Sequence, residues 1–359
     1  YDDSNFDQVF SNGQFLENSL SLTGGNDRSN VFFSLSDLDQ QGIIRNNSDY
    51  RRTTARLNSS HLLSDKIKLN TKSTYTRTGS NRILKGATSS GLHLGLLRTP
   101  PDFDNTGYRG SYYANSTASP ATNRHRSYLE YLGGDNTPTY NNPSWTLNEQ
   151  ENKARVDRFI SSFELTASPL SWVDLIGRVG IDFYSEQKNE FYTPGSAAGA
   201  FSTGLYEQTL ASSTIFNMDY IAKANRKLAK NLNGNLLVGF NYNSRSLTVN
   251  GVNTVNFIQF ADVAGGVRDK DNALPENVTT ISSQGRERTA AVYSSMGLSG
   301  WDMLYLTGTV RVESASTFGD AADNTFLFPS ASSPGSFPNL ADWKTRRSLL
   351  ANCVFPTAK

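Results

Sequence analysis

The feature that most constrains this chain is a two-residue alternation of apolar and polar side chains over segments of strand length. Between Met303 and Val312 the apolar residues Leu304, Leu306, Val310 and Val312 alternate with Tyr305, Thr307, Thr309 and Arg311. Successive side chains of a β-strand point to opposite faces, so this segment predicts a strand with one apolar and one polar face.

The same alternation recurs along the chain and predicts about eleven strands in all. Further apolar series are Val31, Phe33 and Leu35; Ile67, Leu69 and Tyr75; Phe159, Phe163 and Leu165; Val173, Leu175, Val179, Ile181 and Phe183; Phe216, Met218 and Tyr220; and Leu236, Val238, Phe240 and Tyr242. No run approaches the roughly 20 apolar residues that a membrane helix requires. Any crossing of a membrane would therefore be made by strands.

The composition fits a membrane barrel better than a soluble protein of this size. Only 37% of the residues are hydrophobic, yet the chain has 20 Phe, 16 Tyr and 4 Trp. Disordered chains are poor in aromatic residues, whereas a barrel needs apolar side chains only at alternate strand positions. A secreted all-β protein is the alternative that composition leaves open.

The connections between the predicted strands alternate in length. Short links are predicted at 60–65, 168–171, 227–233 and 299–302, and long ones at 39–50, 79–153, 187–208, 251–285 and 316–342. This alternation sends every long loop to the same rim, as in barrels with short periplasmic turns and long extracellular loops. A sandwich gives no reason for it. We therefore predict an all-β fold, a transmembrane antiparallel up-and-down β-barrel.

Two sets of strand residues are assigned by this alternation. We expect Leu304, Leu306, Val310 and Val312 to face lipid, and Arg158, Arg178, Asp182, Tyr305 and Arg311 to face the lumen. Charged side chains facing hydrocarbon would be costly, which favours the inward assignment. Trp172 follows a predicted tight turn and is expected near the inner of the two interfaces of the membrane that the barrel spans, where indole rings anchor barrels. Segments such as 206–228 and 236–250 exceed the span of a bilayer, so they should project beyond it on the loop side.

The chain carries no recognisable catalytic constellation. No Ser/His/Asp order, HExxH motif, CxxC motif, phosphate loop or dinucleotide fingerprint is present. Of its three histidines, His61 falls in a predicted tight turn, and His93 and His125 fall in the longest loop. We predict that the protein is not an enzyme and uses no cofactor.

Neither the net charge nor the paired aspartates of the sequence identify a ligand. A formal charge of +1 gives no field that would attract nucleic acid. The pair Asp102 and Asp104, like Asp320 and Asp323, lacks the glycine and terminal glutamate of a calcium loop, so we predict no metal site.

Aromatic residues gather in the longest predicted loop. Tyr108, Tyr112, Tyr113 and Trp145 are the candidates for contact with a ligand, because aromatic rings stack on sugars and on peptide side chains. Packing of the loop itself explains the same residues, and the sequence leaves both roles open.

Several segments carry a resemblance to a known family. They are residues 20–44 (LSLTGGNDRSNVFFSLSDLDQQGII), 50–60 (YRRTTARLNSS), 96–104 (LLRTPPDFD), 142–147 (NPSWTL), 171–196 (SWVDLIGRVGIDFYSEQKNEFYTPGS), 287–319 (ERTAAVYSSMGLSGWDMLYLTGTVRVESASTFG) and 328–332 (FPSAS). In this order and spacing the chain resembles the SusC/RagA-type TonB-linked (TonB-dependent) outer-membrane transporters.

The resemblance implies a barrel of roughly 22 strands with a plug in its lumen. Residues 1–359 would form part of that barrel domain, and the plug, the TonB box and the C-terminal half of the barrel are not recognised in them. Family members import oligosaccharides or peptides through the Gram-negative outer membrane, with energy from TonB and a SusD-like surface lipoprotein as a lid. The implied partners are that lipoprotein, TonB, a glycan or peptide ligand, and outer-membrane lipids.

Two other functions stay open at this stage. A passive porin-like channel would show the same strands and turns. A secreted β-rich carbohydrate-binding or adhesion protein would show the alternation as well, but it would bury its apolar face inside a sandwich.

Overall fold

The computed structural model describes residues 4–84, 89–109, 126–128, 139–197, 203–258, 270–300, 304–318 and 324–333. Most of them form one antiparallel sheet of 11 strands, in which each strand pairs with its neighbours in sequence. The strands are β1 (Gln14–Gly25), β2 (Ser29–Gln41), β3 (Asp49–Ser64), β4 (Ile67–Asn81), β5 (Gln150–Leu170), β6 (Val173–Tyr192), β7 (Leu205–Ala229), β8 (Leu232–Val255), β9 (Val278–Gly300), β10 (Leu304–Ala315) and β11 (Thr325–Ser332). The predicted strand count and up-and-down order are confirmed.

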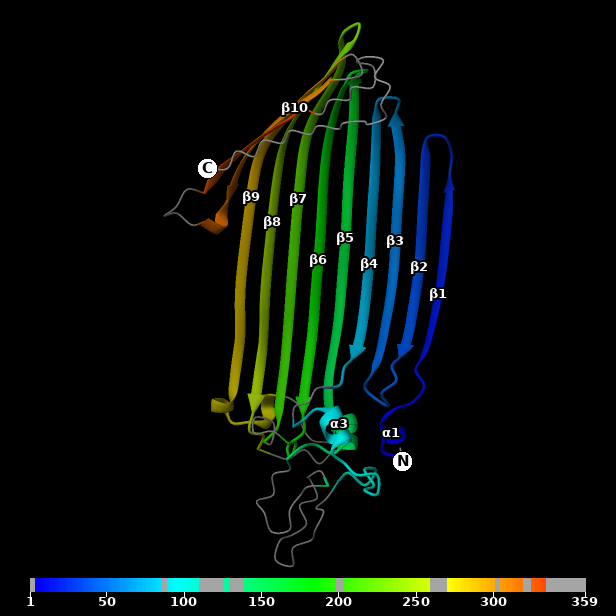
Figure 1. Cartoon of the computed structure of the whole chain (residues 1–359), viewed down its shortest axis with the longest axis vertical. Helices are drawn as coiled ribbons and strands as arrows, with labels where there is room; N and C mark the ends of the chain where they lie inside the picture. The colour runs from blue at the N-terminus through cyan, green and yellow to red at the C-terminus, as the bar shows by residue number, and fades with distance from the viewer. Residues whose placement is uncertain are drawn as a thin grey trace, which may run out of the picture.

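Tight turns and long connections lie at opposite ends of the sheet (Figure 1). Residues 26–28, 65–66, 171–172 and 230–231 make the tight turns, and we call their end of the sheet the turn end. Residues 42–48, 82–149, 193–204 and 256–277 connect the strands at the other end, the loop end. This arrangement confirms the predicted alternation of short and long links.

The exact limits of the links were predicted less well. The turn expected at 60–65 belongs almost wholly to β3, and β7 continues to Ala229 within the turn expected at 227–233. His61 therefore lies in a strand, opposite Leu69 of β4, and its assignment to a turn was wrong. Polar residues continue these strands because backbone pairing in a hairpin does not depend on side-chain polarity.

The strands at the middle of the chain are much longer than a bilayer crossing needs. β7, β8 and β9 have 25, 24 and 23 residues, whereas a tilted barrel strand crosses with about 9–11. The excess length lies on the loop side of the apolar series, as expected from the sequence.

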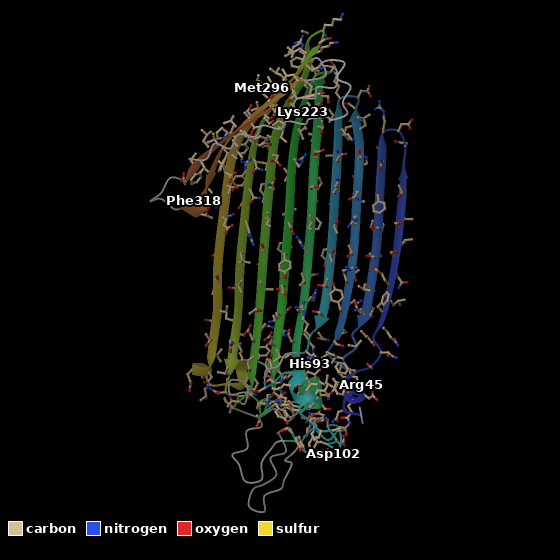
Figure 2. The ribbon with its side chains drawn as sticks, viewed as in Figure 1. Arg45, His93, Asp102, Lys223, Met296 and Phe318 are labelled. Atoms are coloured by element: carbon tan, nitrogen blue, oxygen red, sulfur yellow. The ribbon has the colours of Figure 1, made fainter. Side chains whose placement is uncertain are left out.

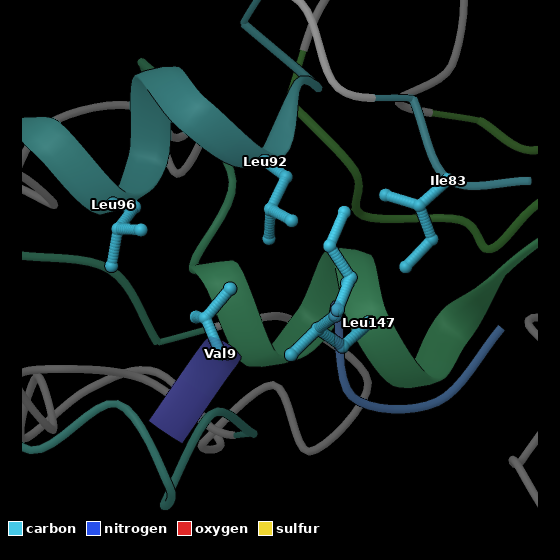
Figure 3. Packing of buried hydrophobic residues seen from close by; sticks show 6 residues of the cluster. Val9, Ile83, Leu92, Leu96 and Leu147 are labelled. Carbon is cyan, nitrogen blue, oxygen red and sulfur yellow. The ribbon is translucent and has the colours of Figure 1, made fainter. Parts of the chain in front are cut away.

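A small folded unit covers the loop end. It consists of the helices α1 (Ser4–Val9), α2 (Leu92–Leu97) and α3 (Pro143–Glu149) with residues 42–48, 82–84, 89–109, 139–142 and 193–197, and we call it the cap. Its core contains Val9, Ile44, Ile83, Leu92, Leu96 and Leu147, each at most 6% exposed (Figure 3). Three short 3-10 helices, η1 (Lys270–Asn272), η2 (Pro275–Asn277) and η3 (Ser316–Phe318), lie in other connections.

Local sequence signals explain how the cap forms. Asn142 caps α3 by accepting a hydrogen bond from the Ser144 amide at 2.8 Å, and Pro143 occupies the first helical position, where no amide hydrogen is needed. Gly95 allows α2 to lie close to the segment that leads into α3, since a Cβ there would lie 2.1 Å from the Asn141 carbonyl oxygen. A substitution at Gly95 would push the two helices apart.

The sandwich alternative is not supported by the architecture. The 11 strands in the described residues form one sheet, with no second sheet stacked on it. Within the described parts of the chain, no helix has the length and apolar character needed to cross a membrane.

Candidate functional site

The pairing of the strands gives the sheet two chemically distinct faces. Leu306 of β10 is opposite Leu298 of β9, and Val312 is opposite Val292, so apolar residues of neighbouring strands share a face. The shared face continues through Phe240, Met218 and Val179 of β8, β7 and β6. The predicted lipid-facing residues Leu304, Leu306, Val310 and Val312 all lie on this face, which we call the outer face.

The predicted lumen-facing residues lie together on the opposite, inner face. Following the register from strand to strand places Arg158, Arg178, Asp182, Tyr305 and Arg311 on this side of the sheet. The structure thus separates the two predicted sets as the alternation requires. What each face contacts in the cell remains a prediction.

The apolar series of the outer face has the height of a membrane. On β6 it runs from Val173 to Phe183. Ten residue steps of about 3.3 Å, tilted by about 40°, span about 25 Å along the membrane normal, which is the height of the apolar band of outer-membrane barrels. We call this series and its partners on the neighbouring strands the belt.

Aromatic residues mark the limit of the belt toward the loop end. Tyr75, Phe159 and Phe183 stand side by side in the register of β4, β5 and β6. Beyond them the outer face becomes polar and charged, with Arg77 pairing with Asp157 at 3.8 Å. An aromatic girdle followed by charged groups is the pattern of a membrane interface.

The inner face carries ion pairs along its length. Arg158 pairs with Asp182 at 2.6 Å, and Arg178 pairs with Glu164 at 2.7 Å. Arg311 pairs with Glu313 within its own strand. Such groups require water or polar partners around them, which the inner face of a barrel supplies.

A hollow of about 490 Å³ lies in the inner face over β2 to β6. Its lining includes Asn30, Phe32, Asn58, Asn70, Lys72 and Glu164 with its partner Arg178. Asn70 donates to the Glu164 carboxylate at 3.2 Å, so the hollow offers amide, ammonium and carboxylate groups beside one aromatic ring. This set can hydrogen-bond a polar solute.

Sequence reasoning did not single out Asn58 and Glu164, although both line this hollow. Each occupies a polar position of an alternating segment, so its face was predictable. The convergence of residues from five strands on one hollow could not be predicted, because it depends on the pairing register of the strands.

Two of the four candidate aromatic residues of the longest loop, Trp145 and Tyr108, lie within the cap. Trp145 of α3 is 1% exposed and donates its indole N–H to the Ser196 hydroxyl at 2.9 Å. Tyr108 packs edge-on against it and donates to Glu149 at 2.8 Å. Of the two roles left open by the sequence, this geometry favours packing of the cap for Trp145. Tyr112 and Tyr113 lie outside the described residues.

The electrostatics of this cluster reflect its burial. Glu149 is 1% exposed and pairs with Arg109, while Tyr108 is half-buried beside it. Burial raises the pKa of the Tyr108 hydroxyl, so this group stays neutral and serves as a hydrogen-bond donor. In the structure the Tyr108 hydroxyl donates a hydrogen bond to the buried Glu149 carboxylate.

No group of three metal-binding side chains occurs among the described residues. Asp104 accepts hydrogen bonds from the hydroxyl and the amide of Thr106, and these bonds lower the pKa of its carboxyl group. Asp320 and Asp323, the other acidic pair noted in the sequence, lie outside the described part of the chain.

No protein-family model and no curated protein matches this chain. Solved structures do match it. The RagAB peptide transporter is similar at 13% identity and a TM-score of 0.70, over 95% of this chain and 36% of that chain. The unliganded ferric citrate transporter FecA matches at 11% identity and a TM-score of 0.52, over 94% of this chain and 41% of that one. The outer-membrane transporter YddB from Escherichia coli matches at 12% identity and a TM-score of 0.51, over 89% and 36%.

These matches define the class of fold. The chain has the fold of a segment of barrel wall from outer-membrane transporters, and it spans about two fifths or less of the length of those proteins. The higher TM-score of the RagAB structure confirms the resemblance to the SusC/RagA type at the level of the fold. The matched proteins are transporters.

Proposed function

We propose that this chain forms part of the wall of a TonB-dependent nutrient importer of the SusC/RagA type in the outer membrane of a Gram-negative bacterium. The observation that carries the proposal is the division of one up-and-down sheet into an outer apolar belt about 25 Å tall and an inner face of ion pairs and amides. Cargo would pass along the inner face.

The cargo and partners follow from the same proposal. The inner hollow, with Asn58, Asn70 and the Glu164–Arg178 pair, suits peptides or oligosaccharides, both of which present many hydrogen-bonding groups. The cap offers an already folded surface at the loop end for a SusD-like lipoprotein lid. TonB would act through a region outside this chain.

Membrane insertion is tested on the whole protein that contains this chain. Outer membranes are washed with alkaline carbonate and then extracted with detergent. We expect the protein to resist the wash and to appear only in the detergent extract, because the belt requires an apolar solvent. Release by carbonate would overturn the proposal in favour of a secreted adhesion protein.

Import is tested by uptake of fluorescent peptides and oligosaccharides in cells with and without a functional TonB system. We expect uptake of one of the two cargo classes, and its loss without TonB. Uptake that persists without TonB would instead indicate a passive porin-like channel. Arg178→Gln, in the inner hollow, should reduce uptake, whereas Arg286→Gln, on the outer face near the loop end, is the matched control.

A further inference from the structure

The outer face has an apolar hollow at the turn end, separate from the inner face proposed to guide cargo. Its volume is about 270 Å³, and Trp172, Leu228, Leu236, Met296 and Leu298 are among its lining residues. Figure 2 shows Met296 at this end of the sheet, far from Arg45 and Asp102 of the loop end. The hollow is therefore an indentation at the turn-end margin of the belt.

A glycine lies in the lining of this hollow. Gly234 of β8 lies in the register between Arg226 of β7 and Leu298 of β9. A Cβ at this position would lie 2.8 Å from the Leu228 side chain. The Leu228 side chain therefore lies over this position, and Leu228 and Leu298 line the hollow around Gly234.

The guanidinium of Arg226 is part of the lining of the same hollow. The Arg226 guanidinium lies over the Trp172 ring, 5.2 Å from its centroid, and it has no carboxylate partner among the described residues. Stacking on a ring holds a guanidinium in place and leaves its N–H groups free to bind a phosphate. The backbone of Trp172 is itself fixed, because its carbonyl accepts from the Asn225 amide at 2.8 Å.

Further basic residues occur in the sequence around Arg226. From Tyr220 to Leu236 the basic residues are Lys223, Arg226, Lys227 and Lys230, and no acidic residue occurs. Arg226 lies on the outer face, whereas Lys223 and Lys227 occupy inner-face positions of β7. Lys230 is exposed in the β7–β8 turn. An apolar hollow beside Arg226, which has no carboxylate partner among the described residues, and beside the exposed turn residue Lys230 suits an acyl chain joined to an anionic headgroup.

We propose that this hollow binds one anionic glycerophospholipid from the membrane leaflet at the turn end, with an acyl chain against Trp172, Leu228 and Met296 and its phosphate on Arg226. The proposal rests on the proposed function, with the tight turns facing the periplasm as in other outer-membrane barrels. The bound lipid would hold the short β7–β8 turn at a fixed depth in the membrane.

The test uses the whole protein purified in detergent and delipidated, with lipid binding followed by native mass spectrometry. Phosphatidylglycerol, phosphatidylcholine and lipid A are added separately. We expect one tightly bound phosphatidylglycerol per protein, at least fivefold weaker binding in Arg226→Gln, and no change in Arg286→Gln. Gly234→Val, whose side chain would displace Leu228 from the lining of the hollow, should weaken binding by a similar factor while Arg226 is retained.

Three results would overturn the lipid site. They are equal binding of phosphatidylcholine, a preference for lipid A, and unchanged phosphatidylglycerol binding in both Arg226→Gln and Gly234→Val. Each would leave the proposed importer intact, since the protein would still be membrane-embedded. Release of the protein by carbonate would be the distinct failure of the proposed function itself.

Discussion

The cap and the strands of the belt bury their apolar residues in opposite ways. In the cap, Leu92 is completely buried and Leu147 is 2% exposed, as in the core of a soluble protein. In the belt, Leu306 and Val310 remain 42% and 41% exposed within the protein. The cap makes its own apolar interior, whereas the belt requires one from its surroundings.

This difference teaches that the two regions are stabilised by different terms. The cap depends on close packing between helices, for which each buried methyl group counts. The belt depends on backbone hydrogen bonds between strands and on transfer of its outer face into hydrocarbon. Substitutions should therefore have different effects in the two regions, and four measurements can sharpen or break the comparison.

The largest effect is expected in the core of the cap. Leu147→Ala should cost about 2–5 kcal/mol, because it leaves a cavity in a packed cluster. We expect faster cleavage of the loop-end connections by added protease, with the strands still assembled. Leu97→Ala, at a position that is 72% exposed on α2, is the control and should change nothing. Equal cleavage of the two variants would show that the packing of Leu147 does not stabilise the cap.

The belt should respond to charge. Val310→Arg places a guanidinium on the outer face within the belt, where it costs up to about 2–4 kcal/mol against hydrocarbon. Thr309→Arg is the adjacent change on the inner face and should be tolerated. The measurement is the amount of heat-modifiable, folded protein in the outer membrane. If the Thr309 variant fails and the Val310 variant assembles, the two faces have been assigned the wrong way round.

The same contrast explains which features the sequence could predict. The faces of Leu304 and Arg311 follow from a period of two residues, which is a local property of the chain. The partners of Trp145 and Glu149 lie in distant connections, at Ser196 and Tyr108, and no local pattern encodes such contacts. Turn limits also escaped prediction, since hairpin pairing extends through polar residues such as Ser64.

Alkaline pH should loosen the junction of the strands with the cap. Tyr192, at the loop end of β6, is 7% exposed, and burial together with the charges of Glu190 and Glu207 raises its pKa from 10.0 to about 12. The fold thus favours the neutral phenol. This contribution to stability is complete below pH 10 and is lost as the pH rises through about 12.

Protease cleavage at the loop end, measured as a function of pH, checks this expectation. Cleavage of the wild type should increase between pH 10 and about 12, while Tyr192→Phe should remove part of that increase. An identical pH profile for the two proteins would mean that this phenol does not stabilise the junction. The belt, which lacks such a buried junction, should stay assembled throughout.

The smallest effect concerns the inner face. Arg158 and Asp182 are 49% and 25% exposed in their side chains and form a pair at 2.6 Å. A double-mutant cycle with Arg158→Gln and Asp182→Asn, read out by urea unfolding in detergent micelles, should give a coupling of about 0–1 kcal/mol, because water screens an exposed pair. If the inner face were dry, loss of one partner alone would leave an uncompensated charge and cost about 3–5 kcal/mol. A cost of that size would mean that the inner face, like the cap, is a closed interior, and the contrast between the two regions would then hold only for the outer face.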